Sequence, residues 1–459
     1  MASTKITRTP SSNGNQKTWT WSAWIKNNGA SGDATYQYLM EANYGNQARY
    51  TYICLRHGTI ETYGGDYQTS NSQMSFDVST TRLLRDPSAW YHIVVAMDTT
   101  QGTSTDRLKI YINGVQETSF QGYVGSGASA TFPAQNDVTF FNVTTTENSI
   151  GNAFDGNMAH VHFVDGAALT PATFGETDST SGIWKPKASP SGITYGTNGF
   201  FLKFENSGNL DLDSSGNNLT FATTGTLTQN LDTPSNNFCT MNPLASYYSA
   251  STFTNGNNTV TTTSGAHDVD TSTLAVGAGL WYYEAKLLTA PDGNCLIGIQ
   301  SQPQVDGELG EDTYSYGLMC SNGNIIGPSS ASASYGVSVS AGDVVGVYID
   351  LTANKLYFAK AGVIMNSGTG FSIVAPASQT TLPAATNVYF PACGDASSSS
   401  AFVWQFNFGS GYFGTTAVTS AVADAGGEGL FEYDPSAGTF DSASKDFRAI
   451  CTKNIKEFG

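Results

Sequence analysis

The run WYHIVVAMD at residues 90–98, followed after a polar loop by LKIYINGV at residues 108–115, decides the fold class. Side chains alternate in character along both runs, as they do in strands whose two faces meet different surroundings. The pair Asn113-Gly114 closes the second run and is a strong short signal for a tight hairpin turn. The stretch therefore predicts two β-strands with a hairpin turn after them.

The same alternation occurs near the start of the chain, in WTWSAWIK at residues 19–26. It predicts a strand with Trp19, Trp21, Ala23 and Ile25 on one face and polar side chains on the other. A tyrosine-rich span follows at residues 36–67, and no helical pattern of useful length separates the strand candidates. Many short strands with turn signals between them predict an all-β sandwich.

The second half repeats this organisation after a segment rich in Pro and Asn at residues 231–237. Residues 342–350, GDVVGVYID, are apolar on both faces and predict a central, buried strand. We therefore predict two tandem antiparallel β-sandwiches, at residues 1–235 and 236–412. Residues 413–459 are expected to complete or dock onto the second sandwich.

Composition excludes several classes of function. The formal net charge is −17, and the 20 Lys and Arg residues form no basic stripe, so nucleic-acid binding is not expected. The six cysteines stand far apart, which favours buried free thiols over a zinc site. Residues 1–14 are polar and no long apolar run occurs, so neither a signal peptide nor membrane insertion is expected.

Several motifs resemble known domain families. Residues 90–94 and 108–114, with 154–156 leading to 168–171, resemble a laminin G-like domain of the concanavalin A-like jelly roll. Three segments of the second half resemble a SPRY domain: residues 281–284, 342–347 and 356–358. Together with NNFCTMNPL at residues 236–244 and FRAICTKN at residues 447–454, this order of modules resembles virion proteins of marine tailed bacteriophages.

The phage resemblance implies a virion surface structural protein, made in the host cytoplasm, that contacts other capsid or tail proteins and self-associates. Because the first strand pattern already begins at Trp19, capsid decoration or an appendage is favoured over a tail fibre with a long N-terminal anchor. Weak binding to a host surface glycan would aid adsorption. The alternatives are a receptor-binding tail fibre or tail spike with a specific glycan site, or a polysaccharide depolymerase.

No catalytic constellation is evident, so the chain is predicted not to be an enzyme. Glycosidases on jelly-roll folds use paired carboxylates, and the nearest acidic cluster is Asp306, Glu308, Glu311 and Asp312. This cluster lies in a Gly-rich loop and is interpreted as solvated.

Glycan binding requires aromatic rings beside polar hydrogen-bonding groups. Six residues fit this requirement: Tyr44, Tyr63, Tyr67 and Asp66 in the first half, and Tyr314 and Tyr316 in the second. The alternative is that these tyrosines pack within the sandwiches.

A calcium ion is the one cofactor that the sequence suggests. Asp211, Asp213 and Asn217 supply oxygen ligands within a short loop, and a polar turn is the alternative. His160 and His162 are predicted to face solvent from one strand, with a shared zinc ion as the alternative.

Overall fold

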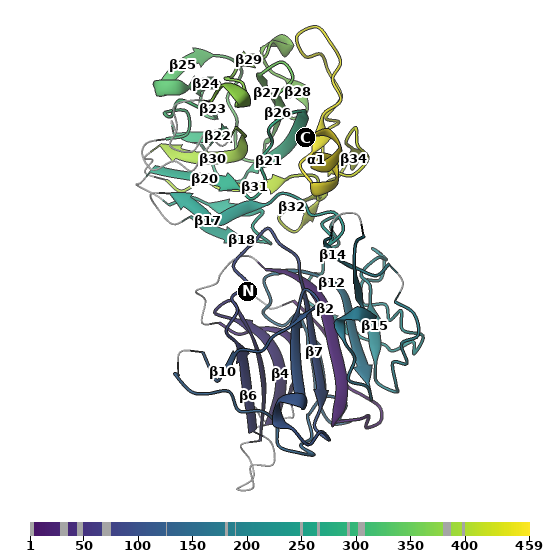
Figure 1. Ribbon diagram of the computed structural model, residues 1–459. Helices are drawn as coiled ribbons and strands as arrows, with labels where there is room; N and C mark the ends of the chain where they lie inside the picture. The colour runs from purple at the N-terminus through teal and green to yellow at the C-terminus, as the bar shows by residue number, and fades with distance from the viewer. Residues whose placement is uncertain are drawn as a thin grey trace. The chain divides into compact units, whose positions relative to one another are not determined.

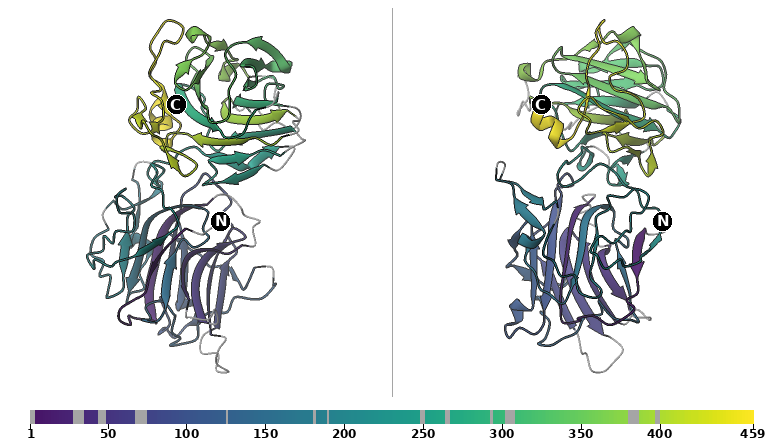
Figure 2. Two further views of the ribbon diagram at one scale, coloured as in Figure 1. Left: turned by 180° about the vertical axis from the view of Figure 1, so that it is seen from behind. Right: turned by 90° about the vertical axis from the view of Figure 1, so that its right-hand side faces the viewer.

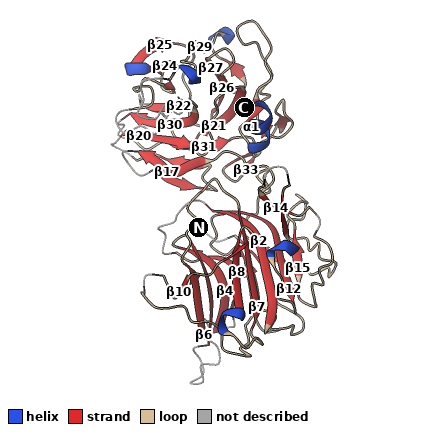
Figure 3. Ribbon diagram, in the orientation of Figure 1, coloured by secondary structure: helices blue, strands red, loops and turns tan. Residues whose placement is uncertain are grey.

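The structure is a computed structural model, and it describes residues 4–27, 35–43, 49–66, 75–124, 126–179, 182–188, 190–247, 251–263, 267–291, 294–301, 308–379, 387–396 and 400–459. The chain divides into two compact units, Met1–Gln229 and Asn230–Gly459 (Figure 1). The segment rich in Pro and Asn therefore begins the second unit. Strands dominate both units, which confirms the predicted all-β class (Figure 3).

The first unit contains two main sheets, here called sheet A and sheet B. Sheet A has the strand order β10 (Phe120–Gln121), β6 (Ser75–Thr80), β5 (Thr59–Asp66), β4 (Arg49–Arg56), β3 (Gln37–Asn43), β11 (Glu147–Ile150), β1 (Lys5–Arg8) and β16 (Ala222–Thr224). Sheet B has the order β15 (Phe200–Leu202), β12 (Gly156–Asp165), β2 (Thr18–Asn27), β7 (Tyr91–Asp98), β8 (Leu108–Ile112) and β9 (Val115–Gln116).

The core of the first unit lies between sheets A and B. Strand β2 contributes Trp19, Trp21, Ala23 and Ile25 to this core, as its alternation predicts. The turn between β8 and β9 has positive φ angles at both Asn113 and Gly114, 50° and 81°. That geometry matches the right-handed twist of the two strands, and it explains why this dipeptide stands there.

A further segment covers the outer face of sheet B. It includes β13 (Gly175–Thr177) and β14 (Trp184–Pro186), which pair with each other. The indole Nε1–H of Trp184 donates to His92 Nδ1 at 3.0 Å, and the Tyr195 hydroxyl lies 2.8 Å from His162 Nδ1. Burial lowers the pKa of His92 to about 3 and that of His162 well below its ordinary value.

The predicted exposure of the strand holding His160 and His162 is therefore wrong for His162. Its side chain is buried beneath this cover, and its ring stacks on Phe201 with centroids 3.8 Å apart. A bulge between Ala159 and His162 also breaks the regular alternation on which the prediction relied.

The second unit also contains two main sheets, here called sheet C and sheet D. Sheet C has the order β17 (Met241–Tyr247), β20 (His267–Ser272), β30 (Phe390–Ala396), β22 (Cys295–Gln300), β23 (Ser315–Met319), β24 (Asn324–Gly327) and β25 (Ala331–Ser334). Sheet D has the order β18 (Thr252–Thr254), β19 (Thr259–Thr261), β31 (Val403–Asn407), β21 (Leu280–Leu287), β26 (Val344–Asp350), β27 (Lys355–Lys360) and β28 (Val363–Ile364). Strand β29 (Phe371–Ser372) pairs with β27, and β36 (Arg448–Ala449) pairs with β21.

Strand β26 lies between β21 and β27, and every one of its residues is buried, so the predicted central strand is confirmed. One face of sheet D contributes to the core between the sheets. Its other face carries Tyr282, Tyr348 and Tyr357 in one row across three strands. The closing part of the chain packs Phe431, Phe440 and Phe447 onto that row, and all six aromatic rings are fully buried.

This closing part includes two short hairpins and the C-terminal helix. The hairpins are β32 (Tyr412–Phe413) with β33 (Thr416–Ala417), and β34 (Val422–Ala423) with β35 (Leu430–Phe431); the helix is α1 (Thr452–Phe458). Figure 2 shows the closing part in yellow from two further sides. Two basic residues of the closing part form ion pairs within the second unit: Lys445 pairs with Asp350, and Lys453 with Glu428.

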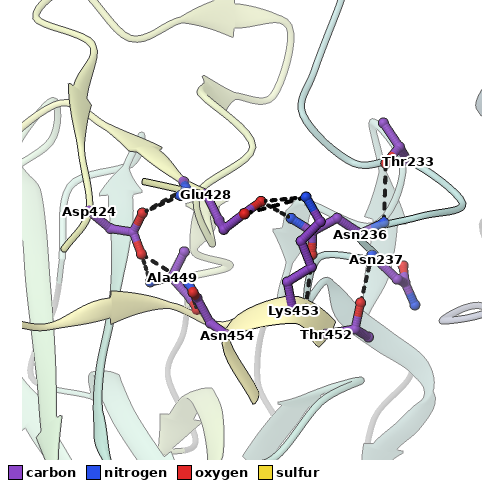
Figure 4. A network of polar contacts seen from close by, with 10 residues as sticks. Thr233, Asn236, Asn237, Asp424, Glu428, Ala449, Thr452, Lys453 and Asn454 are labelled. Carbon is purple, nitrogen blue, oxygen red and sulfur yellow. Dashed lines mark hydrogen bonds and ion pairs between the residues drawn. The ribbon is translucent and has the colours of Figure 1, made fainter. Parts of the chain in front are cut away.

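Polar contacts join the start of the second unit to its end (Figure 4). The Asn236 side chain donates to Glu428, and its oxygen accepts the backbone N–H of Lys453. The Asp424 carboxylate accepts the backbone N–H of Ala449 and the side-chain amide of Asn454, both at 2.9 Å. The two motifs at residues 236–244 and 447–454 thus lie side by side, and we call this set of contacts the clasp.

All six cysteines are buried and free, as the sequence predicts. Within the described residues, no helix has the length and apolar character needed to cross a membrane.

Candidate functional site

The outward face of sheet A carries a row of side chains that cross five adjacent strands. Directly opposed residues share a face of a sheet, and the register aligns Ser149, Glu41, Tyr52, Tyr63 and Asp77 in that order. The neighbouring residues Met40, Ile53, Thr62 and Phe76 lie on the opposite side, where Met40, Ile53 and Phe76 belong to the core. The row is therefore directed away from the core.

Tyrosine rings cover the middle of this row. The rings of Tyr50, Tyr52 and Tyr63 are nearly parallel, with centroid distances between 5.2 and 5.9 Å. Tyr50 and Tyr63 are partly exposed. A Cβ atom on Gly65 would lie 2.5 Å from the Tyr63 hydroxyl, so this glycine gives the ring room to lie over the sheet. We call this surface the tyrosine face, and it includes Tyr36 and Tyr38, whose rings stack at 5.7 Å.

Arg56 lies at one end of the tyrosine face. Its guanidinium group is 4.3 Å from the ring centroid of Tyr36 and 4.1 Å from that of Tyr123, both within the range of cation–π attraction. It also donates to the Tyr123 hydroxyl and lies 3.6 Å from the Glu61 carboxylate. These contacts hold a buried cation in place.

Three carboxylates accompany the tyrosines. Glu61 is fully buried and accepts the Tyr52 hydroxyl at 2.7 Å, while burial raises its pKa. Asp77 is partly exposed and accepts the Tyr123 backbone N–H at 2.9 Å, and burial also raises its pKa. Glu41 accepts hydrogen bonds from Ser149 and Asn152. The face thus offers apolar ring surfaces beside hydrogen-bonding groups, which is the chemistry that suits a saccharide.

The predicted glycan residues of the first half fall unevenly on this face. Tyr63 lies at its centre. Tyr44 and Tyr67 lie outside the described residues, and Asp66 is described in its backbone only, as the last residue of β5. The sequence prediction for these three positions stays a prediction.

Sequence reasoning missed most of the face. The missed residues are Tyr36, Tyr38, Glu41, Tyr50, Tyr52, Arg56, Glu61, Asp77 and Tyr123. A usable signal existed, because Tyr36 and Tyr38, like Tyr50 and Tyr52, are two residues apart and must share a face of a strand. The pairing of strands that brings Tyr63 and Asp77 beside them has no local signal.

The predicted glycan residues of the second half lie in the interior of the second unit. Tyr314 and Tyr316 are 5% and 2% exposed and belong to the core between sheets C and D. The Tyr316 hydroxyl accepts the Val374 backbone N–H at 3.0 Å. Neither ring presents a free face to a sugar, so the packing alternative describes both residues.

The predicted calcium ligands form a turn. Each oxygen of the Asp213 carboxylate accepts two hydrogen bonds, from Phe201, Ser215 and Leu219. Asn217 donates its amide to two backbone carbonyls, and Asp211 accepts the Thr223 hydroxyl. Throughout the part of the chain that the structure describes, no group of three or more His, Cys, Asp or Glu side chains is placed to hold a metal ion. We therefore propose no cation site here.

The acidic loop of the second unit is only partly described, because Asp306 lies outside the described residues. The Glu311 carboxylate accepts the Glu308 backbone N–H at 3.0 Å, and burial followed by the charge of Glu311 raises the pKa of Glu308. Asp312 accepts the side-chain amide of Gln300 at 3.2 Å. These contacts fix the loop locally.

Fold and surface together define a protein built from two β-sandwich modules. Residues 2–175 match the family model described as the concanavalin A-like lectin/glucanases superfamily, of laminin G type, and residues 280–396 match the SPRY domain model. The chain thus contains a laminin G-like, concanavalin A-like domain followed by a SPRY domain. Domains of these two kinds are typically non-catalytic binding modules.

Solved structures similar to the chain include two human domains. The SPRY domain of human HERC1 is 16% identical, covers 36% of this chain and 96% of its own, and has a TM-score of 0.29. A second human SPRY domain is 17% identical, covers 32% of this chain and 90% of its own, and has a TM-score of 0.25. No curated protein matches the sequence.

Proposed function

We propose that this chain is a non-enzymatic surface protein of a tailed-bacteriophage particle, and that its first module binds host saccharides through the tyrosine face. The second module would then contact other virion proteins. The phage setting rests on the resemblance of the module order and of the two motifs that form the clasp. Saccharide binding rests on one observation, the partly exposed tyrosine rings beside Glu41 and Asp77.

The rings favour binding over packing for a physical reason. Tyr50 and Tyr63 remain partly exposed although parallel rings surround them. Aromatic rings offer an apolar face to the C–H groups of a sugar, while the tyrosine hydroxyls and nearby carboxylates accept hydrogen bonds from sugar hydroxyls. A surface of this kind binds a repeated, uncleaved polymer weakly at each unit and more tightly over many units.

A glycan array with the full chain tests saccharide binding. Tyr50→Ala and Tyr63→Ala are expected to abolish sugar-specific binding, whereas Tyr412→Ala, a partly exposed tyrosine of the second unit, is expected to retain it. Equal binding by all four proteins, or binding by none, would overturn the proposal.

Competition with host adsorption tests the phage setting. Added chain is expected to slow adsorption of the particle, and an antibody against the chain is expected to label intact virions. Tight binding to a single sugar sequence would instead promote the alternative of a receptor-binding tail fibre or spike. Virions that carry no such label would refute a role on the particle surface.

A further inference from the structure

The charge of the tyrosine face limits which saccharides it can take. Arg56 is the one Lys or Arg among the described residues assigned to this face, and it is 5% exposed. Tyr36 and Tyr123 lie over its guanidinium group, and Glu61 lies beside it. A sulfate or carboxylate on a sugar could reach this cation only by displacing a tyrosine ring and an existing ion pair.

The remaining charges of the face are negative. Glu41 and Asp77 stand at the two ends of the tyrosine row and are both partly exposed, so a bound polymer would lie between them. Glu61 balances Arg56 beneath the rings. Counting these four residues gives one positive and three negative charges when all are ionised. The formal net charge of the whole chain, −17, has the same sign.

From this arrangement we infer that the tyrosine face selects uncharged saccharides and rejects sulfated or carboxylated ones. The inference rests on the proposed saccharide binding and adds the class of ligand. Sugar hydroxyls can donate to Glu41 and Asp77, whereas an anionic group brings only acceptors and a repelling charge to the same positions. Selection thus arises at the two partly exposed carboxylates, while the rings supply the affinity.

The test compares polymers that differ in charge alone. The probes are dextran and dextran sulfate of one length, with further neutral polysaccharides from the glycan array and their sulfated forms. Binding of the full chain is measured by affinity electrophoresis, with a chelator present so that divalent cations cannot bridge like charges. At low salt we expect the affinity for the neutral polymer to exceed that for its sulfated form by about tenfold or more. Added salt should narrow that difference, because it screens the repulsion.

Two variants locate the source of the selection. The double variant Glu41→Gln/Asp77→Asn keeps oxygen acceptors while removing two negative charges, and it should reduce the preference for the neutral polymer about fivefold. The control Asp106→Asn removes one negative charge from the short 3-10 helix before β8, where Asp106 pairs with Lys109, and should leave the preference unchanged. Circular dichroism of each variant checks that the fold is kept.

The outcomes separate this inference from the proposed function. If the sulfated polymers bind as well as the neutral ones, the inference fails while saccharide binding stands. Should no polymer bind the folded chain, both fail. A preference for neutral polymers that survives the double variant unchanged would overturn the assignment to Glu41 and Asp77.

Discussion

The outer faces of sheet A and sheet D both carry a row of tyrosines, but only the row on sheet D is covered by another part of the chain. Sheet A carries Tyr52 and Tyr63 side by side on adjacent strands, and sheet D carries Tyr282, Tyr348 and Tyr357 in the same way. The tyrosine face keeps partly exposed rings, whereas the closing part of the chain buries the row on sheet D completely. A row of tyrosines across adjacent strands thus suits a binding surface and a packing surface equally, and the presence of a covering segment decides between them.

Polar anchors hold the cover on sheet D. The Glu284 carboxylate, on the same strand as Tyr282, accepts the backbone N–H groups of Glu432 and Tyr433 at 2.9 and 2.8 Å. Burial raises the pKa of Glu284 to about 7, while these donors oppose that rise. On the tyrosine face, Glu61 and Asp77 contact Arg56 and the Tyr123 backbone instead, and Tyr50 and Tyr63 stay partly exposed.

The largest expected effect comes from removing a ring of the cover. Phe440 is fully buried and contacts Tyr348 and Tyr357 with centroid distances of 4.9 and 5.2 Å. Phe440→Ala is expected to lower the free energy of unfolding by about 3–5 kcal/mol, since it leaves a cavity on the sheet. Denaturant unfolding measures the change, and Val363→Ala, at a 71% exposed position of the same unit, should cost less than about 0.5 kcal/mol. A loss below about 1 kcal/mol for Phe440→Ala would show that the cover is not integral to the fold.

The clasp should have the next largest effect. Asp424→Ala removes the acceptor for the backbone N–H groups of Glu428, Gly429 and Ala449, and buried unpaired donors are costly. A loss of about 2–4 kcal/mol is expected in denaturant unfolding. Hydrogen exchange should rise first in helix α1 and around Asn237. If exchange instead rises evenly over the second unit, the clasp does not stabilise the ends of the unit independently of its core.

Acid should loosen the cover on sheet B. The pKa of His92 is lowered in the folded state to about 3 from 6.5, so the unfolded state binds more protons between these values. Stability supplied by neutral His92 is therefore complete above about pH 6.5 and is lost as the pH falls, by about 2 kcal/mol between pH 7 and pH 5. Protonation at Nδ1 would also end the hydrogen bond that Trp184 donates there.

The comparison of the wild-type protein with His92→Gln isolates this effect. Buried carboxylates such as Glu61 have raised pKa values, so acidification increases their contribution to the stability of the folded state. That contribution is the same in both proteins. The variant should show a shallower loss of thermal stability between pH 7 and pH 5. Equal slopes in the two proteins would mean that His92 does not carry the acid response.

The smallest effect on stability is expected on the tyrosine face itself. Tyr63→Ala removes a partly exposed ring, so the free energy of unfolding should fall by about 1 kcal/mol or less although saccharide binding is lost. Denaturant unfolding and the glycan array, run on one preparation, separate the two quantities. A loss comparable to that of Phe440→Ala would show that the tyrosine face is a packing surface after all.

Sequence patterns predicted the regular parts of this fold. Alternation identified β2, and the apolar run at residues 342–350 identified β26 as central, because burial on one or both faces imposes those patterns. The exposure of His162 was predicted wrongly. Alternation along a strand does not reveal that a mostly irregular segment from elsewhere in the chain covers one face of the sheet. Tyr314 and Tyr316 belong instead to the core between sheets C and D, which is the packing alternative that the sequence left open.

The candidate site was predictable only in part. Of the residues predicted for the first half, Tyr63 lies on the tyrosine face, and its neighbours there come from strands β3, β4 and β6. Their convergence depends on strand register and on pairings between distant segments, such as Asp77 with Thr131. Neither can be recognised from a short window of sequence.

Both units bring their first and last segments together. In the first unit β1 pairs with β16, with Ile6 opposite Thr223, and in the second unit Phe238 bridges to Cys451. Each sandwich could therefore be cut open at a surface loop and its original ends joined by a short linker, giving a circular permutant with the same layers. The same adjacency would let either sandwich be inserted as a whole into a loop of another protein, since its two ends leave from neighbouring points.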